Sequence, residues 1–161
     1  MKPIPWTTAK ILEATEGNLL YGDINKVFAG VSIDSRRIDP DDLFVAIKGD
    51  VHDGHGFAGD VIADGIAGLI INQDKAAAAP GQLCQKKGLV CVIVTDTTKA
   101  LGDLAALQRQ RSNASVVAIT CSNCKTTTRT MTAAVTAQCF STLTTSGNLN
   151  NEIGLDRKSV V

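Results

Sequence analysis

The most constraining feature of this sequence is a short polar turn between an apolar run and a helix-like segment. The apolar run covers residues 115–120, the turn at residues 121–124 has the sequence Cys-Ser-Asn-Cys, and Lys125 and three threonines follow. Strand, tight loop, Lys-Thr and helix is the order in which many proteins hold a nucleoside triphosphate. Backbone N–H groups of such a loop, together with the helix N-terminus, face the phosphates. The pattern therefore predicts a nucleotide-binding loop.

Each polar residue of this loop has an expected role. Lys125 would lie near the β- and γ-phosphates of ATP. The Thr126 hydroxyl is an oxygen donor of the kind that Mg²⁺ prefers. Two features of the loop are unusual. General P-loops have four residues between their two glycines, whereas only two residues lie between the corresponding positions here. Both of those positions are cysteines in place of glycines. The residues expected to contact ATP are Cys121, Ser122, Asn123, Cys124, Lys125, Thr126 and Thr127.

Hydrophobic periodicity alternates between helical and extended patterns along the chain. Helices are predicted at residues 8–14, 57–64, 98–110 and 126–139. Strands are predicted at residues 18–21, 27–33, 43–47, 67–72, 89–95, 115–120 and 140–145. This alternation predicts an α/β fold with at least one mainly parallel sheet. Residues 75–88, interrupted by Pro80-Gly81, indicate a boundary between a first domain at 1–82 and a second at 83–161.

Composition excludes several classes of function. The 16 basic residues balance 16 acidic ones, and only 4% of residues are aromatic, which argues against a nucleic-acid partner. No apolar run approaches the roughly 20 residues of a membrane span. The first residues lack the apolar core of a signal peptide. We therefore expect a cytoplasmic protein with no nucleic-acid or membrane partner.

The cysteines offer an alternative interpretation of the turn. Their number, five, is odd, and a reducing compartment does not favour a disulfide framework. Cys121 and Cys124 have the Cys-x-x-Cys spacing of zinc and redox sites, but a structural zinc site needs four ligands, and no second cysteine pair has such spacing. A redox motif leaves the following Lys-Thr-Thr-Thr unexplained. A Cys-x-x-Cys redox or zinc protein remains one alternative.

Three motifs occur in order along the chain. The first is Asp34-Ser35-Arg36, followed by residues 42–49 (DLFVAIKG) and 53–57 (DGHGF). The second is the loop at residues 119–128, and the third is residues 147–154 (GNLNNEIG). Together they resemble the Mur ligases of bacterial peptidoglycan synthesis, whose compact ATP loop also has two residues between its glycines. The third motif is similar to the branch of that family that uses D-alanyl-D-alanine.

The resemblance implies a fold and a reaction. The fold is a small N-terminal substrate domain followed by the first elements of a P-loop-type parallel-sheet ATPase domain. In the reaction, ATP phosphorylates the terminal carboxylate of UDP-N-acetylmuramoyl-tripeptide, and the amine of D-alanyl-D-alanine attacks the acyl phosphate. The resemblance implies Lys125 as the catalytic residue, and Thr126 and Glu152 as ligands of Mg²⁺. It implies that the UDP end of the substrate contacts Ile33, Ser35, Asp50, Val51 and His52.

Two departures from the family limit what this chain is expected to do. Mur ligases continue with a complete ATPase domain and a domain that brings in the amino acceptor, so we expect the 161-residue chain by itself to be inactive. Cys121 and Cys124 stand at the glycine positions of the loop, where a Cβ costs on the order of 1–3 kcal/mol of strain. We therefore expect weak ATP binding. A module that binds a UDP-muramoyl-peptide without catalysis is the second alternative.

Overall fold

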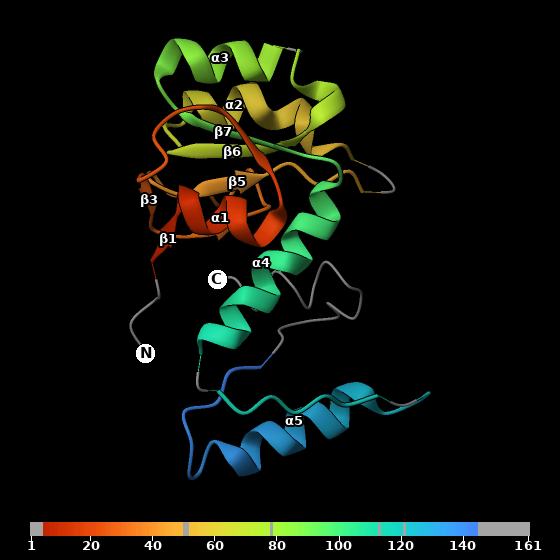
Figure 1. The fold of residues 1–161 in the computed structure, drawn as a ribbon. Coiled ribbons are helices and arrows are strands. Elements are labelled where there is room, and N and C mark those ends of the chain that lie inside the picture. The colour runs from red at the N-terminus through yellow and green to blue at the C-terminus, as the bar shows by residue number, and fades with distance from the viewer. Residues whose placement is uncertain (1–4, 50–51, 78, 113, 121, 145–161) are drawn as a thin grey trace.

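A five-stranded sheet lies at the centre of the fold (Figure 1). The computed structural model describes residues 5–49, 52–77, 79–112, 114–120 and 122–144. Neighbouring strands β4 to β7 are parallel, and β2 adds an antiparallel edge beside β7. In spatial order the strands are β2 (Asn18–Tyr21), β7 (Val90–Val94), β6 (Gly68–Asn72), β5 (Leu43–Val45) and β4 (Val31–Ser32).

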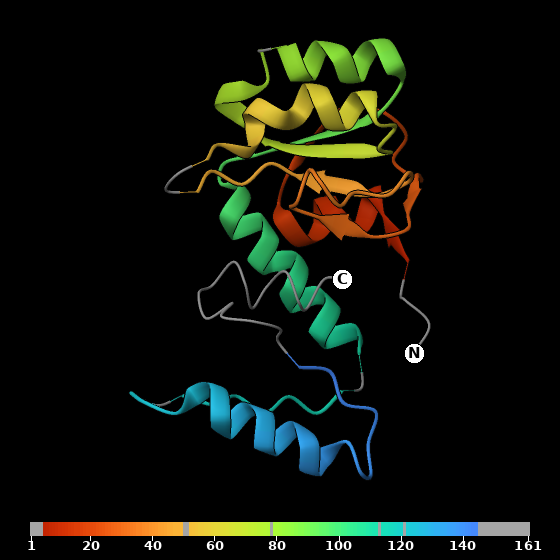
Figure 2. The same ribbon diagram turned by 180° about the vertical axis from the view of Figure 1, so that it is seen from behind.

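Helices cover both faces of this sheet (Figures 1 and 2). Helices α1 (Thr8–Thr15) and α4 (Thr97–Arg111) pack on one face, and α2 (Ala58–Ala63) and α3 (Ala79–Lys87) pack on the other. The remaining elements are the paired strands β1 (Trp6–Thr7) and β3 (Val27–Phe28), the short 3₁₀ helices η1 (Gly54–Phe57) and η2 (Gln73–Lys75), and α5 (Lys125–Thr136).

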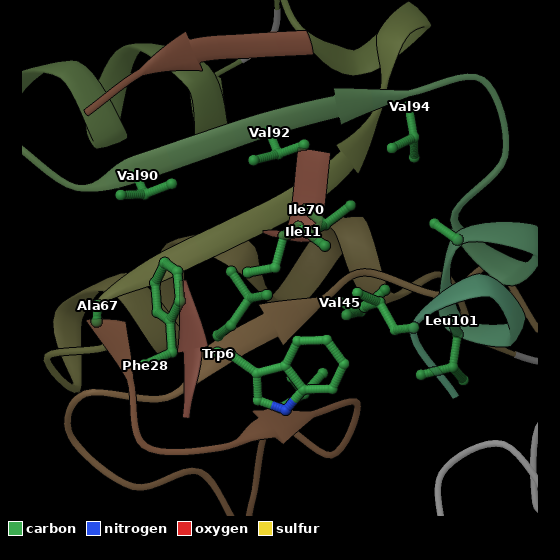
Figure 3. Close-up of a cluster of buried hydrophobic side chains, with 14 of the residues drawn as sticks. Trp6, Ile11, Phe28, Val45, Ala67, Ile70, Val90, Val92, Val94 and Leu101 are labelled. Atoms are coloured by element: carbon green, nitrogen blue, oxygen red, sulfur yellow. The ribbon is translucent and has the colours of Figure 1, made fainter. Parts of the chain in front are cut away.

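Alternate side chains of the central strands enter two separate cores. Ile70 and Val92 point toward the α1 and α4 side, where they join Trp6 and Phe28 (Figure 3). Their neighbour Leu69 belongs to the cluster beneath α2 and α3. Because successive residues of a strand face opposite sides, a strand covered on both faces must be apolar throughout. The apolar run at 43–47 meets this expectation, since residues 43–46 are all buried.

Local signals fix the ends of the two helices on the first face. Thr7 caps α1, accepting the Lys10 N–H at 3.4 Å. The Asp96 carboxylate caps α4, accepting the N–H groups of Thr98 at 2.7 Å and Lys99 at 3.2 Å. Such caps satisfy N–H groups that have no partner within the helix. The predicted helices at 8–14 and 98–110 are confirmed with small changes at their ends.

One predicted element of the first hundred residues needs correction, and the predicted boundary region contains a helix that was not predicted. The strand predicted at 27–33 is two strands, because β3 pairs antiparallel with β1 whereas β4 pairs parallel with β5. The interrupted region at 75–88 contains helix α3, since a proline is tolerated in the first turn of a helix. The boundary predicted at residue 82 therefore falls inside α3, and the sheet continues through β7.

The strands predicted at 115–120 and 140–145 are absent from the described residues, which end at 144. Val116 and Val117 are exposed, and no strand lies beside them there to accept their backbone N–H groups. Helix α5 does form, but none of its residues is buried. It lies apart from the five-stranded sheet, beyond the far end of α4 (Figures 1 and 2).

Candidate functional site

The carboxyl ends of strands β4 to β7 meet at one edge of the sheet because these strands are parallel. In open α/β sheets, ligands bind in the crevice outside this edge. The segments that follow β4, β5 and β7 carry Ser35, His52 and Thr97, respectively, and Asn72 is the last residue of β6. The topology therefore brings the predicted substrate residues Ser35 and His52 to neighbouring loops.

The turn after β4 is held by its own side chains. Asp34 forms an ion pair with Arg36, whose Nε donates to Oδ1 at 3.0 Å and Nη2 to Oδ2 at 3.2 Å. The Ser32 hydroxyl accepts the Asp34 N–H at 3.2 Å. Ser35 follows on this turn and is half-buried, and Ile33 packs against the core below. Asp34 and Arg36 therefore shape the turn that presents Ser35.

The loop after β5 is closed at its base. Lys48 and Asp53 form an antiparallel bridge, and the Gly49 N–H donates to the His52 carbonyl at 2.9 Å. His52 is exposed, whereas Asp50 and Val51 lie outside the described residues. A Cβ on Gly54 would lie 2.8 Å from the Ile47 carbonyl oxygen, so glycine is required for this close approach.

A hydrogen-bond chain joins this loop to the end of β6 and the start of α4. His55 Nδ1 lies 2.6 Å from Asp53 Oδ1, and His55 Nε2 accepts the Asn72 N–H at 3.1 Å. The Asn72 side-chain oxygen accepts the Thr97 N–H at 3.0 Å. Hydrogen bonds from the backbone and the side chain of His55 hold the pKa of Asp53 below its ordinary value.

His55 is buried, consistent with a packing role, but sequence reasoning missed its partner Asn72 and the Thr97 N–H that the Asn72 side chain accepts. In the sequence, the only signal for these two residues is their position, since Asn72 ends an apolar strand and Thr97 begins a helix. Neither signal indicates that the two residues face each other.

The predicted nucleotide loop shows part of the backbone geometry that a phosphate-binding loop needs. Cys124 precedes α5 in the left-handed conformation, with φ 65°, and no side chain caps the helix. The first N–H groups of α5 are thus open to an anion. Side chains at positions 122–127 are all exposed, including Lys125 and Thr126. Cys121, Glu152 and the whole motif at 147–154 lie outside the described residues.

Whether the described residues can hold a metal ion depends on the donor atoms of their side chains. The Thr126 hydroxyl is a hard oxygen donor of the kind Mg²⁺ takes, but its predicted partner Glu152 is not among the described residues. In the described part of the chain, no group of three or more His, Cys, Asp or Glu side chains is placed to hold a metal ion. The carboxyl edge of the sheet carries the predicted substrate residues Ser35 and His52, and we call it the substrate edge. It lies away from the start of α5, where the predicted nucleotide loop ends (Figure 1).

Comparison with known proteins identifies the family. Residues 27–109, more than half of the chain, match the profile described as "Mur ligase family, catalytic domain". This chain belongs to the Mur ligase family. It is 39% identical to the UDP-N-acetylmuramoyl-tripeptide–D-alanyl-D-alanine ligase of Escherichia coli (strain K12), over 92% of this chain and 30% of the relative. It thus spans about a third of such a Mur ligase.

Solved Mur ligases share its fold. MurF from Acinetobacter baumannii superposes with a TM-score of 0.84 at 31% identity, covering 99% of this chain and 33% of that one. MurF from Thermotoga maritima, solved in complex with ADP, superposes with a TM-score of 0.66 at 25% identity, covering 81% of this chain and 28% of that one. The predicted α/β fold of an N-terminal Mur ligase domain is therefore confirmed. None of the described helices is both long and apolar enough to span a membrane.

Proposed function

We propose that this chain is the N-terminal part of a ligase that joins D-alanyl-D-alanine to UDP-N-acetylmuramoyl-tripeptide, with ATP and Mg²⁺ as cofactors. The observation that carries this proposal is the substrate edge of the sheet, which brings Ser35 and His52 to neighbouring loops in a chain that superposes on MurF over 99% of its length. Within these 161 residues, the activity proposed is binding of the UDP end of the precursor.

The residues have the following proposed roles. Ile33, Ser35 and His52, with Asp50 and Val51, contact the UDP end of the substrate. Lys125 neutralises phosphate charge at the start of α5, beside the uncapped N–H groups of that helix. Thr126 and Glu152 supply oxygens to Mg²⁺. The site for D-alanyl-D-alanine belongs to the parts of the relatives that this chain does not match.

A cytoplasmic location completes the proposal. The four cysteines that the structure describes are free thiols, which suits a reducing compartment. We place the end of the first domain near Ser112 in place of residue 82, because β7 and α4 complete the sheet and its cover.

Calorimetric titration tests the binding role. We expect saturable binding of UDP-N-acetylmuramoyl-tripeptide to the 161-residue chain, and much weaker binding of ATP with Mg²⁺. Ser35→Ala should weaken precursor binding, whereas the matched control Ser112→Ala, at the far end of α4, should not. Tight ATP binding without precursor binding would contradict the proposal.

Two further measurements address the alternatives. We expect no ADP release from ATP, the tripeptide precursor and D-alanyl-D-alanine together, as for a binding module without catalysis. One zinc ion per purified chain would instead favour the Cys-x-x-Cys alternative, which involves Cys121 and Cys124.

A further inference from the structure

We propose that His55 is a positioning residue that fixes the loop carrying His52 at the substrate edge of the sheet. This inference rests on the proposed function, because the loop matters only if the UDP end of the precursor binds there. Its basis is the hydrogen-bond chain from Asp53 through His55 and Asn72 to Thr97, which joins the loop after β5 to the end of β6 and the start of α4.

The contacts of His55 define one tautomer. Nε2 faces the Asn72 N–H at 3.1 Å and must accept, so the ring proton is on Nδ1. Nδ1 then donates to Asp53 Oδ1 at 2.6 Å. Both ring nitrogens are satisfied by opposite roles, and only 6% of the side chain is exposed. An apolar side chain of similar size could fill this space but could make neither bond.

The link from His55 to the loop runs through Asp53. The same carboxylate oxygen also accepts the His55 backbone N–H at 3.0 Å, and this bond caps η1. Asp53 is the residue opposite Lys48 in the bridge that closes the loop, directly after His52. His55 therefore sets where this closing residue lies relative to the end of β6.

The second link runs through Asn72. Its backbone binds His55, while its side chain binds the first N–H of α4 at Thr97, a residue that is itself buried. Loss of the imidazole would leave the part-buried Asn72 N–H without its acceptor, and an unpaired donor shielded from water is costly enough to move a loop. Small displacements of groups that hold a substrate weaken its binding.

Three substitutions separate the two links. His55→Phe removes both hydrogen bonds, His55→Asn keeps a donor near the position of Nδ1, and His55→Gln keeps an acceptor near the position of Nε2. The control Thr15→Val removes a buried hydroxyl that donates to the Ile11 carbonyl at 2.7 Å, outside this chain of hydrogen bonds. Thermal unfolding and circular dichroism establish the temperature at which each variant is folded.

The test is calorimetric binding of UDP-N-acetylmuramoyl-tripeptide to the full 161-residue chain, at a temperature where the variants are folded. We expect His55→Phe to raise Kd about tenfold, the equivalent of one lost hydrogen bond, with part of the loss restored in His55→Gln or His55→Asn. Thr15→Val should lower the unfolding temperature without changing Kd. In the wild type, imidazole ¹⁵N spectra should show the Nδ1–H tautomer.

The possible failures are distinguishable. If the wild-type chain does not bind the precursor, both the proposed function and the positioning role of His55 are contradicted. If the wild type binds and a folded His55 variant binds equally well, only the positioning role falls. An Nε2–H tautomer, or an equal loss of affinity in Thr15→Val, would also overturn it. If His55→Phe does not fold, unchanged affinity in both His55→Gln and His55→Asn is decisive against the proposal.

Discussion

Cys124 occupies a backbone conformation that suits glycine. Its φ of 65° lies in the left-handed region, which costs a residue with a Cβ about 1–2 kcal/mol. We expect Cys124→Gly to stabilise the start of α5 by about 1 kcal/mol, measured as slower amide hydrogen exchange in its first turn. Cys124→Ala keeps the Cβ and should show no such gain. Equal protection in both variants would indicate that the thiol, and not the backbone, limits the helix.

The four described cysteines fall into a buried pair and an exposed pair. Cys84 and Cys91 are buried side by side between α3 and β7, and the contact with Cys84 together with burial raises the pKa of the Cys91 thiol. Burial shields both thiols from reagents, and the raised pKa of Cys91 disfavours its reactive thiolate, so both should react slowly. In a Cys121→Ser variant, we expect Ellman's reagent to modify Cys124 and Cys139 in the native protein, and the buried pair only after denaturation. Rapid reaction of all four would contradict this packing.

Asp53 should make stability depend on pH. Hydrogen bonds from the His55 backbone and side chain lower its folded-state pKa, so its contribution is present above the ordinary aspartate value. That contribution is lost as the pH falls through the lowered value. We expect Asp53→Asn to reduce the free energy of urea unfolding near pH 7, with the difference from wild type shrinking toward pH 3. A difference that stays constant over this range would show that charge at Asp53 does not matter.

At the scale of elements, the connection from β5 to η1 depends on one close approach. The Gly54 N–H donates to the Ile47 carbonyl at 2.8 Å, and a Cβ on Gly54 would lie 2.8 Å from that oxygen. We expect Gly54→Ala to destabilise the fold by about 1–3 kcal/mol, measured by urea unfolding. The matched control is Gly56→Ala in the same short helix, where a Cβ meets nothing within 4 Å. Similar losses in both would show that the close approach at Gly54 is not the cause.

The helices and strands also show which sequence signals are sufficient to predict the structure. Buried strands such as 68–72 and capped helices such as α4 were predictable, because their apolar residues and caps act locally. The strand predicted at 115–120 is absent from the described residues, since its β-branched residues need a neighbouring strand that these residues lack. In the candidate site, the turn with Ser35 and the left-handed Cys124 followed from motifs, whereas the contact of His55 with Asn72 depends on tertiary pairing.

In the molecule as a whole, the tightly packed part of the chain ends near the last turn of α4. Arg111 lies over the Trp6 ring, 5.7 Å from its centroid, and donates to the Pro5 carbonyl at 3.3 Å. These contacts tie the end of α4 to the first strand, and Leu101 and Leu104 of the same helix are fully buried. Beyond it, Val135 and Phe140 are more than 70% exposed. Cooperative unfolding should therefore involve residues 5–112 and leave α5 out.

A pair of truncations tests this division. A 1–112 chain keeps both cores, so we expect the same midpoint of thermal unfolding as the full chain and undiminished binding of UDP-N-acetylmuramoyl-tripeptide. A 1–82 chain ends inside α3 and lacks β7 and α4, which exposes Ile70 and Leu69 on the two faces of β6. It should be unfolded by circular dichroism, because both hydrophobic clusters lose the side chains that β7 contributes. A folded 1–82 chain that binds the precursor would instead place the domain boundary at residue 82.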